Sequence, residues 1–206
     1  MSARLVVVDA GMGNIASVVR ALRHAGAEDV TVSADPDRIH GADMVVVPGQ
    51  GAFRDCSRAF EGGLGEAVRG AITRGVPYLG ICLGLQILFE SSDEAEPTCR
   101  GLGVFAGTVR RLRGGTDLLT GAHLPIPHMG WNLARFRDGR PDDYFYFVHS
   151  YAAAPSDANV TLAVTEYGET FTSAVAKDNV LAVQFHPEKS QGAGLAFLRT
   201  FVEARP

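Results

Sequence analysis

The segment Gly80-Ile81-Cys82-Leu83-Gly84 places a cysteine between two glycines, where an apolar run (76–79) meets a helical-looking stretch (85–89). Glycines two residues before and after a nucleophile permit the sharp, strained strand-to-helix turn of a nucleophile elbow. The following helix would direct its positive N-terminal end at the sulfur, which favours the thiolate. The alternative is a buried cysteine beside two ordinary turn glycines, and this motif alone does not decide between them.

Far downstream, His186 and Glu188 supply what a cysteine nucleophile needs. A histidine can accept the thiol proton, and a carboxylate can hold the imidazole in one tautomer. The two residues follow an apolar run (180–183), and side chains two apart in an extended segment share one face. Pro187 between them disfavours helix at His186. Alone, the segment favours a strand that ends in a polar turn; beside the elbow, it indicates a Cys–His–Glu triad.

A glycine-rich turn, 48–53, follows the buried-looking strand 44–47 and could complete the site. Such turns can point backbone N–H groups outward with no side chain in the way. Acyl transfer needs these donors because its tetrahedral intermediate carries a negative oxygen. The N–H of Leu83, directly after the nucleophile, is the natural donor, and the N–H of Gln50 is the expected companion. A plain tight turn is the alternative at 48–53.

Continuous Val/Ile-rich runs bounded by glycines predict buried parallel strands at 5–8, 30–32 and 44–47 and in the elbow strand before Cys82. Helices are expected up to residue 24, over 65–74 and over 193–203. Alternating segments at 144–148, 162–165 and 172–176 predict antiparallel strands. We therefore expect an α/β fold with an open, mostly parallel central sheet flanked by helices, and with antiparallel strands added in the C-terminal half. The three site segments all follow strands, where such sheets bind their ligands.

Bulk properties fit one enzyme domain over residues 1–206, with 46% hydrophobic and 20% charged residues. A net charge of −4 argues against nonspecific nucleic-acid binding. Cys56, Cys82 and Cys99 have no metal-binding spacing and are odd in number, which favours a reducing cytoplasm over a disulfide framework. We expect no metal, cofactor, signal peptide or membrane span.

Residues 11–16, Gly-Met-Gly-Asn-Ile-Ala, match a weak form of the dinucleotide-binding fingerprint after a strand. That motif needs an acidic residue at the end of the second strand. Asp35 is near the required spacing but lies beyond the strand, in a Ser-Ala-Asp-Pro turn. Dinucleotide binding is therefore the less favoured interpretation.

Gly-Ile-Cys-Leu-Gly-Leu-Gln (80–86) and His-Pro-Glu-Lys-Ser (186–190) together resemble the triad-type, class I glutamine amidotransferases. Within that family the chain is similar to the glutaminase subunits of imidazole glycerol phosphate synthases. The similarity runs from about Leu5 to about Ser190. The narrower resemblance rests on Gly-Met-Gly-Asn-Ile (11–15), Pro-Gly-Gln-Gly-Ala-Phe (48–53), His-Met-Gly-Trp-Asn (128–132) and Tyr-Phe-Val-His-Ser-Tyr (146–151).

The resemblance implies glutamine amide hydrolysis through a cysteine thioester. Cys82 would attack the amide carbonyl, His186 would carry the proton, and Glu188 would orient the imidazole. Glutamine itself would be held by six residues: Gly51, Gln86, Glu94, His149, Ser150 and Tyr151. A negative Glu94 suits an α-ammonium group. The alternatives are an exposed helix residue for Gln86, one more charge in an acidic run for Glu94, and strand-edge packing for His149 and Tyr151.

The resemblance also implies a partner. Only unprotonated ammonia is nucleophilic, and water would protonate most of it, so the ammonia must pass directly to a second active site. The expected partner is a barrel-shaped synthase subunit in a heterodimer, which turns a phosphoribulosyl aminoimidazole nucleotide into imidazole glycerol phosphate and a purine precursor. Asn14, Trp131, Tyr146 and Lys189 match family positions at that interface. A core tryptophan, a strand tyrosine and a solvated lysine are the alternatives.

Two features depart from the family pattern. Gln50 stands where a small aliphatic residue is expected, and the stretch 113–121 is longer than needed, as in a surface loop. We expect the oxyanion hole to be unformed without the partner. Three other functions stay open: a glutaminase that serves a different synthase, a catalytically silent binding module, and a cysteine hydrolase of another substrate.

Overall fold

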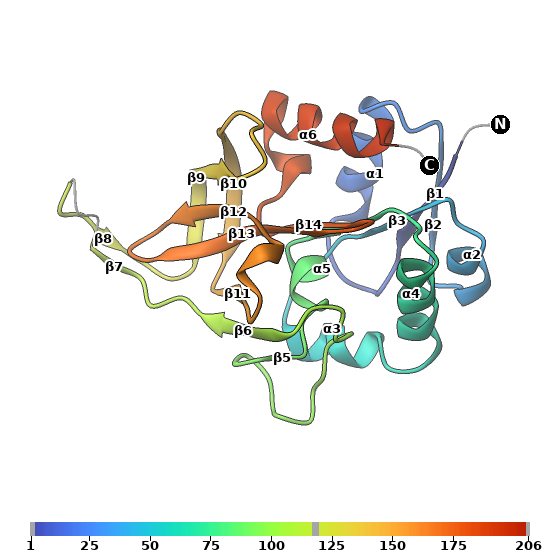
Figure 1. The fold of residues 1–206 in the computed structure, drawn as a ribbon, viewed down its shortest axis with the longest axis horizontal. Helices are drawn as coiled ribbons and strands as arrows, with labels where there is room; N and C mark the ends of the chain where they lie inside the picture. Colours follow the sequence, from blue (N-terminus) through green and yellow to red (C-terminus); the bar gives the residue numbers. More distant parts are fainter. Residues whose placement is uncertain (1–2, 117–119, 205–206) are drawn as a thin grey trace.

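The computed structural model describes residues 3–116 and 120–204. Within them, a mixed twelve-stranded sheet forms the centre, with helices against its N-terminal half (Figure 1). The parallel part runs in the order β14 (Val180–Val183), β4 (Tyr78–Ile81), β3 (Met44–Val47), β1 (Arg4–Val8) and β2 (Asp29–Ser33). The predicted parallel strands are confirmed.

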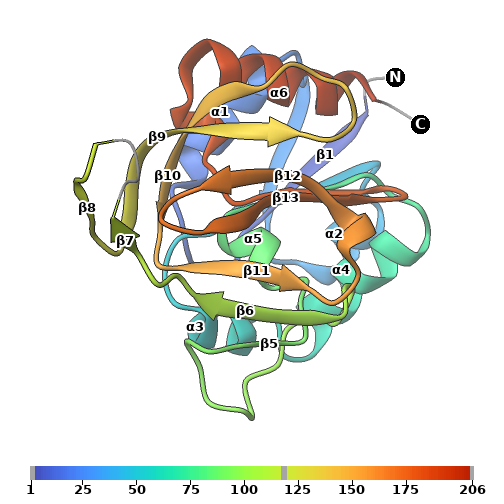
Figure 2. The ribbon, with the colours of Figure 1, turned by 60° about the vertical axis from the view of Figure 1, so that its left-hand side comes forward.

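The antiparallel part continues from β14 through β13 (Thr170–Lys177), β12 (Thr161–Glu166), β9 (His128–Phe136) and β10 (Asp143–His149). Three further strands branch from β13: β11 (Tyr151–Pro155), β6 (Gly107–Arg111) and β5 (Ser91–Ser92). Figure 2 shows β9, β12, β13, β11 and β6 one above another. The predicted fold class, with antiparallel strands in the C-terminal half, is confirmed.

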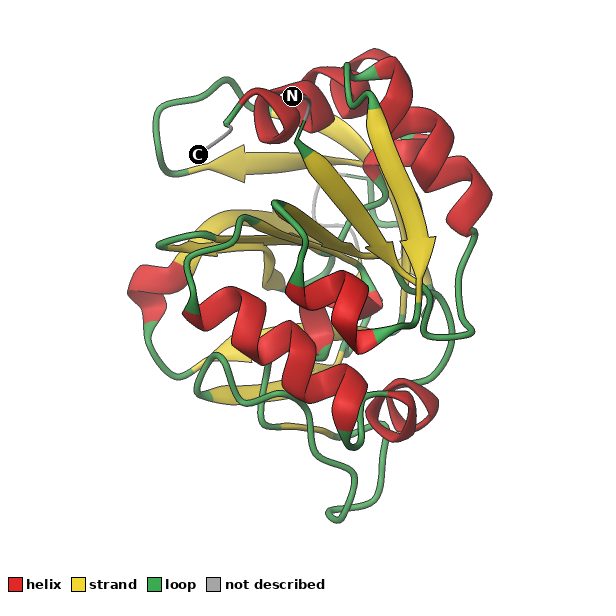
Figure 3. Ribbon diagram, turned by 90° about the vertical axis from the view of Figure 1, so that its right-hand side faces the viewer, coloured by secondary structure: helices red, strands yellow, loops and turns green. Residues whose placement is uncertain are grey.

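Helices cover both faces of the parallel strands (Figure 3). α1 (Ile15–His24) and α6 (Gln191–Glu203) pack together on one face. The other face carries α2 (Pro36–His40), α3 (Phe53–Ala59) and α4 (Gly63–Thr73). Two separate apolar cores result, because successive side chains of a strand point to opposite faces. Val7 and Val46 enter the core under α1 and α6, whereas Val6 and Val45 enter the other.

Two expectations need correction. Within the predicted surface loop 113–121, β7 (Gly115–Thr116) pairs with β8 (His123–Leu124), which follows the loop, so part of that stretch belongs to a small antiparallel ribbon. Residues 117–119 lie outside the described residues. The helix expected at 85–89 is instead α5 (Leu83–Gln86). It ends early because the carbonyls of Ile87 and Leu88 accept N–H groups from the 102–105 segment.

The acidic residue of the weak dinucleotide motif has a structural role. Asp35 caps α2, where its side chain accepts a hydrogen bond from the Asp37 N–H. Two short 3-10 helices complete the described elements: η1 (Ala158–Val160) and η2 (Pro187–Lys189).

The turn at Cys82 has the strained geometry of a nucleophile elbow. Cys82 has φ 54°, a left-handed conformation that is costly for a residue with a Cβ. A Cβ at Gly80 would collide with the Gly84 carbonyl, and one at Gly84 would collide with the Val47 carbonyl. The buried Tyr78 hydroxyl donates to the Gly84 carbonyl at 2.7 Å and holds the turn against its own strand. Both glycines are thus required by close backbone packing.

Gly84→Ala should therefore lower the free energy of unfolding by about 3 kcal/mol, because the added methyl group forces β3 and the elbow apart. Urea unfolding followed by circular dichroism measures this. Gly192→Ala is the matched control, since a Cβ there meets no atom within 4 Å, and its stability should stay within about 0.5 kcal/mol of the parent. Equal stabilities for the two variants would contradict the packing argument.

Candidate active site

Pairing between β4 and β14 brings the elbow and the His186 segment together. The two strands are parallel neighbours, with Ile81 opposite Val183. The Cys82 N–H donates to the Val183 carbonyl at 2.7 Å, one step beyond the ladder. Since both chains leave the sheet at the same edge, Cys82 and His186 meet there although a hundred-odd positions separate them in the sequence.

His186 and Glu188 form a buried pair. His186 Nδ1 lies 2.8 Å from Glu188 Oε1, and the two side chains are only 1% and 2% exposed. His186 is extended, at φ −105° and ψ 93°, as Pro187 predicts. Glu188, however, lies in the 3-10 turn η2, so the expectation that both side chains share one face of an extended segment is wrong. The turn folds the carboxylate back toward the imidazole.

A serine stabilises this turn. The Ser190 hydroxyl donates to the His186 carbonyl at 2.6 Å and accepts the Tyr146 N–H at 2.9 Å. The His186 N–H donates to the Tyr146 carbonyl. The histidine backbone is thereby tied to β10 on one side and to η2 on the other.

The electrostatic surroundings of His186 favour its charged form. Burial lowers its pKa, but interactions with Cys82 and Glu188 outweigh burial and raise the pKa to about 9. Its Nε2 makes no hydrogen bond within the described residues. The imidazole is therefore held through Nδ1 by a carboxylate, with Nε2 left to exchange a proton with the cysteine.

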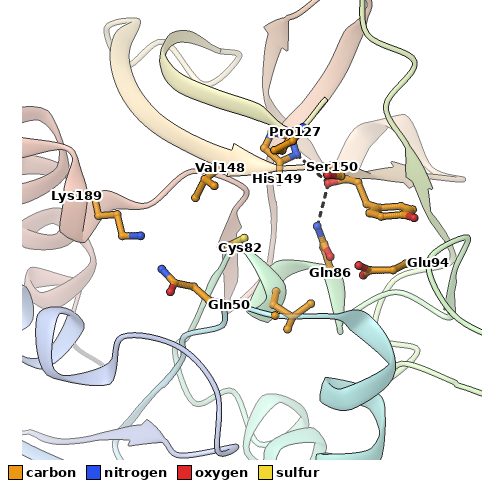
Figure 4. A pocket seen from close by; sticks show the side chains of 12 residues that line it. Gln50, Cys82, Gln86, Glu94, Pro127, Val148, His149, Ser150 and Lys189 are labelled. Carbon is orange, nitrogen blue, oxygen red and sulfur yellow. Dashed lines mark hydrogen bonds between the residues drawn. The ribbon is translucent and has the colours of Figure 1, made fainter. Parts of the chain in front are cut away.

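A cavity of about 350 Å³ opens over Cys82, a size that suits a small ligand (Figure 4). Its lining includes Cys82 and every residue that the sequence assigned to the oxyanion hole or to glutamine: Gln50, Leu83, Gly51, Gln86, Glu94, His149, Ser150 and Tyr151. Pro127, Val148 and Lys189 complete the lining. His186 and Glu188 lie behind it, in the protein interior.

Glu94 is positioned by a distant helix. One of its carboxylate oxygens accepts the Phe53 N–H at 2.8 Å, at the start of α3. Ala52, the residue before α3, offers no side-chain cap. Glu94 thus satisfies an otherwise uncapped helix N-terminus, and this contact fixes an acidic side chain at the wall of the cavity.

The turn that carries Gln50 packs against two other segments. A Cβ at Gly49 would lie 2.5 Å from the Leu83 Cβ, so this turn lies directly on the elbow. On the other side, a Cβ at Gly13 would lie 3.4 Å from the Gln50 nitrogen, and one at Gly51 would lie 3.8 Å from the Met12 sulfur. The 11–13 loop and the 49–51 turn are therefore in close contact.

The four residues assigned to an interface fall in three places. Asn14 is exposed and caps α1 through the Ser17 N–H. Trp131, 47% exposed, and Tyr146 face each other across β9 and β10, with ring centroids 6.3 Å apart. Lys189 lines the cavity. Met129 and Tyr144, also exposed, extend the apolar surface of the β9–β10 pair.

The class-I glutamine amidotransferase family model matches residues 6–204. The chain belongs to the class-I glutamine amidotransferases. It is 48% identical to the imidazole glycerol phosphate synthase subunit HisH of Dechloromonas aromatica, over 98% of this chain and 97% of that protein. The HisH of Methylococcus capsulatus is also 48% identical, with the same coverage. The solved structure of PurLQS from Thermotoga maritima superposes with a TM-score of 0.74 at 17% identity, over 98% of both chains, which shows a shared fold.

In this amidotransferase, the described residues include no cluster of histidine, cysteine or acidic side chains arranged to hold a metal ion. Across the same part of the chain, no helix is both long and apolar enough to cross a bilayer.

Sequence reasoning missed Gln184 and His128. Gln184 is fully buried, and its amide nitrogen lies 3.5 Å from the Cys82 sulfur. A polar residue between Val183 and Phe185, two positions before a candidate catalytic histidine, was the available signal. His128 Nδ1 lies 3.1 Å from His149 Nε2, behind the cavity wall. That pairing has no local signal, because it depends on the register between β9 and β10.

The buried histidines His128 and His149 should make stability depend on acid. Burial lowers the pKa of His128 from 6.5 to about 4. The pKa of His149 is lowered to about 3, and burial is the main cause. Below pH 6.5 the unfolded chain then binds more protons than the folded one, so stability falls as the pH decreases. The expected loss approaches about 1.4 kcal/mol per pH unit for each histidine.

Urea unfolding at pH 7, 6 and 5 tests this, with His128→Gln as the key variant. Its stability should fall less steeply between pH 6 and 5 than that of the parent. His40→Gln, at an exposed histidine, should keep the parent slope. An unchanged slope in His128→Gln would show that this buried histidine does not resist protonation.

Proposed function

We propose that this chain is the glutaminase subunit of an imidazole glycerol phosphate synthase, in histidine biosynthesis. The observation that carries the proposal is a buried Cys82–His186–Glu188 constellation at the base of an amino-acid-sized cavity. The relatives named HisH, at 44–48% identity over nearly the whole chain, support the specific pathway.

Catalysis begins when the thiol proton of Cys82 passes to His186 Nε2. The thiolate attacks the side-chain carbonyl carbon of glutamine, and the Gln50 and Leu83 N–H groups stabilise the negative oxygen. The C–N bond then breaks, His186 returns the proton to the departing ammonia, and a thioester remains. Water attacks the thioester with His186 as base, which releases glutamate and restores the thiol. Throughout, Glu188 stabilises the imidazolium.

Glutamine is oriented with its α-amino group toward Glu94. In Figure 4, Glu94 and Gln86 lie on one side of Cys82, while Gln50 and Lys189 lie on the other. An α-ammonium group at the carboxylate places the side-chain amide near the sulfur. The backbone at Gly51, together with His149, Ser150 and Tyr151, encloses the rest of the ligand.

Ammonia passes to a barrel-shaped cyclase subunit in a cytoplasmic heterodimer, without a cofactor or metal in the glutaminase. The exposed Trp131–Tyr146 surface, with Asn14 and Lys189, is the proposed interface. The contact between the 11–13 loop and the 49–51 turn offers a route from a docked partner to Gln50. Without the partner we expect the oxyanion hole to be unformed and turnover to be very low.

The test is glutamate release by this chain with the barrel subunit from the same genome, with and without the phosphoribulosyl nucleotide. We expect turnover to need both the partner and the nucleotide, and Cys82→Ala to abolish it because no thioester can form. Cys99→Ala, at another buried cysteine, is the matched control and should retain turnover.

Each contrary outcome has a distinct meaning. Fast hydrolysis by the isolated chain would contradict the partner-dependent oxyanion hole. Turnover only with a different synthase would assign this chain to a different biosynthetic pathway. Untouched glutamine under every condition would indicate a silent binding module or another substrate.

A further inference from the structure

A continuous series of hydrogen bonds between side-chain amides and a backbone carbonyl reaches the Cys82 sulfur. Gln184 Nε2 donates to Cys82 Sγ at 3.5 Å, and Gln184 Oε1 accepts from Gln86 Nε2 at 3.2 Å. Gln86 Nε2 also donates to the Tyr151 carbonyl at 3.0 Å. All of these groups are buried or line the cavity.

The direction of every bond in this series follows from one backbone carbonyl. The Tyr151 carbonyl can only accept, so the Gln86 atom that faces it must be the amide nitrogen. That nitrogen donates to Gln184, so the Gln184 atom facing it must be the oxygen. The Gln184 nitrogen is thereby directed at the sulfur of Cys82. The Gln184 backbone is fixed as well, since its N–H donates to the Ser173 carbonyl at 2.8 Å.

The same carbonyl also contacts His149, which is supported in turn by His128. His149 Nδ1 donates to the Tyr151 carbonyl at 2.9 Å, so His149 Nε2 accepts from His128 Nδ1. His128 Nε2 then accepts from Asn132, whose amide nitrogen also donates to the Glu166 carbonyl at 2.8 Å. Both histidines must be neutral for this pattern, which agrees with their lowered pKa values.

We propose that Gln184 is a catalytic residue that stabilises the Cys82 thiolate by donating an amide N–H to the sulfur, and that Gln86 fixes its orientation. The inference rests on the proposed role of Cys82 as the nucleophile. Gln184 exchanges no proton: the thiol proton still moves to His186, and the Gln184 amide stays neutral. Gln86 consequently has two roles, one at the cavity wall and one as the positioning residue for Gln184.

An N–H donor that faces a buried thiolate replaces the water that burial removes, and hydrogen bonds to charged groups are stronger than neutral ones. The titratable groups that interact with the sulfur are His186 and Cys56, and Lys189 and Glu94 line the same cavity. None of them is altered by a substitution at Gln184, so the contribution of its donor can be separated.

The decisive variant is Gln184→Met, which keeps the length of the side chain and removes the donor. The readout is the rate of Cys82 alkylation by iodoacetamide against pH in the full chain, assigned by peptide mass spectrometry. We expect the pH midpoint for alkylation to rise by about one unit. Gln184→Glu, which places an acceptor at the sulfur, should raise it further. In the complex with the barrel subunit, kcat should fall about 10- to 100-fold with little change in KM.

Two further variants keep the test decisive. Ser173→Ala removes a buried hydroxyl beside Gln184 and should leave the midpoint unchanged. Gln86→Met leaves the Gln184 amide unoriented and should raise the midpoint by a smaller amount, which provides the answer if substitutions at Gln184 prevent folding. If Gln184→Met folds and its alkylation midpoint is unshifted, the proposal is overturned. If Gln184→Met does not fold, an unshifted midpoint in Gln86→Met overturns it.

Alkylation needs neither glutamine nor the partner, so it separates this inference from the proposed function. A shifted midpoint in a chain that hydrolyses no glutamine supports the role of Gln184 and contradicts the proposed function. Normal glutamine hydrolysis by Gln184→Met with an unshifted midpoint supports the proposed function and contradicts the role of Gln184. Cys56 does not interfere, because burial is the main cause that raises its pKa to about 12.

Discussion

The parallel pairing of β4 with β14 is the constraint on which the site depends. It joins the Cys82 N–H to the Val183 carbonyl and makes the strained elbow and the His186 turn leave the sheet side by side. The strain at Cys82 persists because backbone packing at Gly84 and the Tyr78 hydrogen bond leave the chain no alternative path. A looser pairing would separate Cys82 from His186.

Around that pairing, the two halves of the sheet contribute different things. The parallel half supplies the elbow and the turn that carries Gln50, both at carboxyl ends of strands buried on two faces. The antiparallel half supplies the His149–Tyr151 wall, the tie between His186 and β10, and the exposed Trp131 surface. β10 lines the cavity with Val148 and His149 at its end. Earlier in the same strand, Tyr144 and Tyr146 contribute, with Trp131 of β9, to the surface proposed to meet a partner.

Burial organises the chemistry as much as proximity does. His186 is nearly inaccessible, yet its pKa is raised because Cys82 and Glu188 together outweigh desolvation. His128 and His149, with no such partners, are kept neutral by the same kind of burial. Burial thus favours a charged His186 beside its two partners and neutral His128 and His149 away from such partners.

The sequence by itself determined the parallel strands, the fold class and the elbow, and it predicted the Cys82–His186–Glu188 triad, because these follow from short-range sterics, periodicity and motif spacing. Glycines beside Cys82, a proline beside His186 and unbroken valine runs act within a few residues. The tertiary structure alone decided the early end of α5, the 3-10 turn that carries Glu188, the capping of α3 by Glu94 and the hydrogen bond from Gln184 to the sulfur. Each of these depends on hydrogen bonds to residues outside the local segment, such as Tyr146 for the turn at Glu188 and Phe53 for Glu94, and local sequence does not record which distant residue becomes the partner.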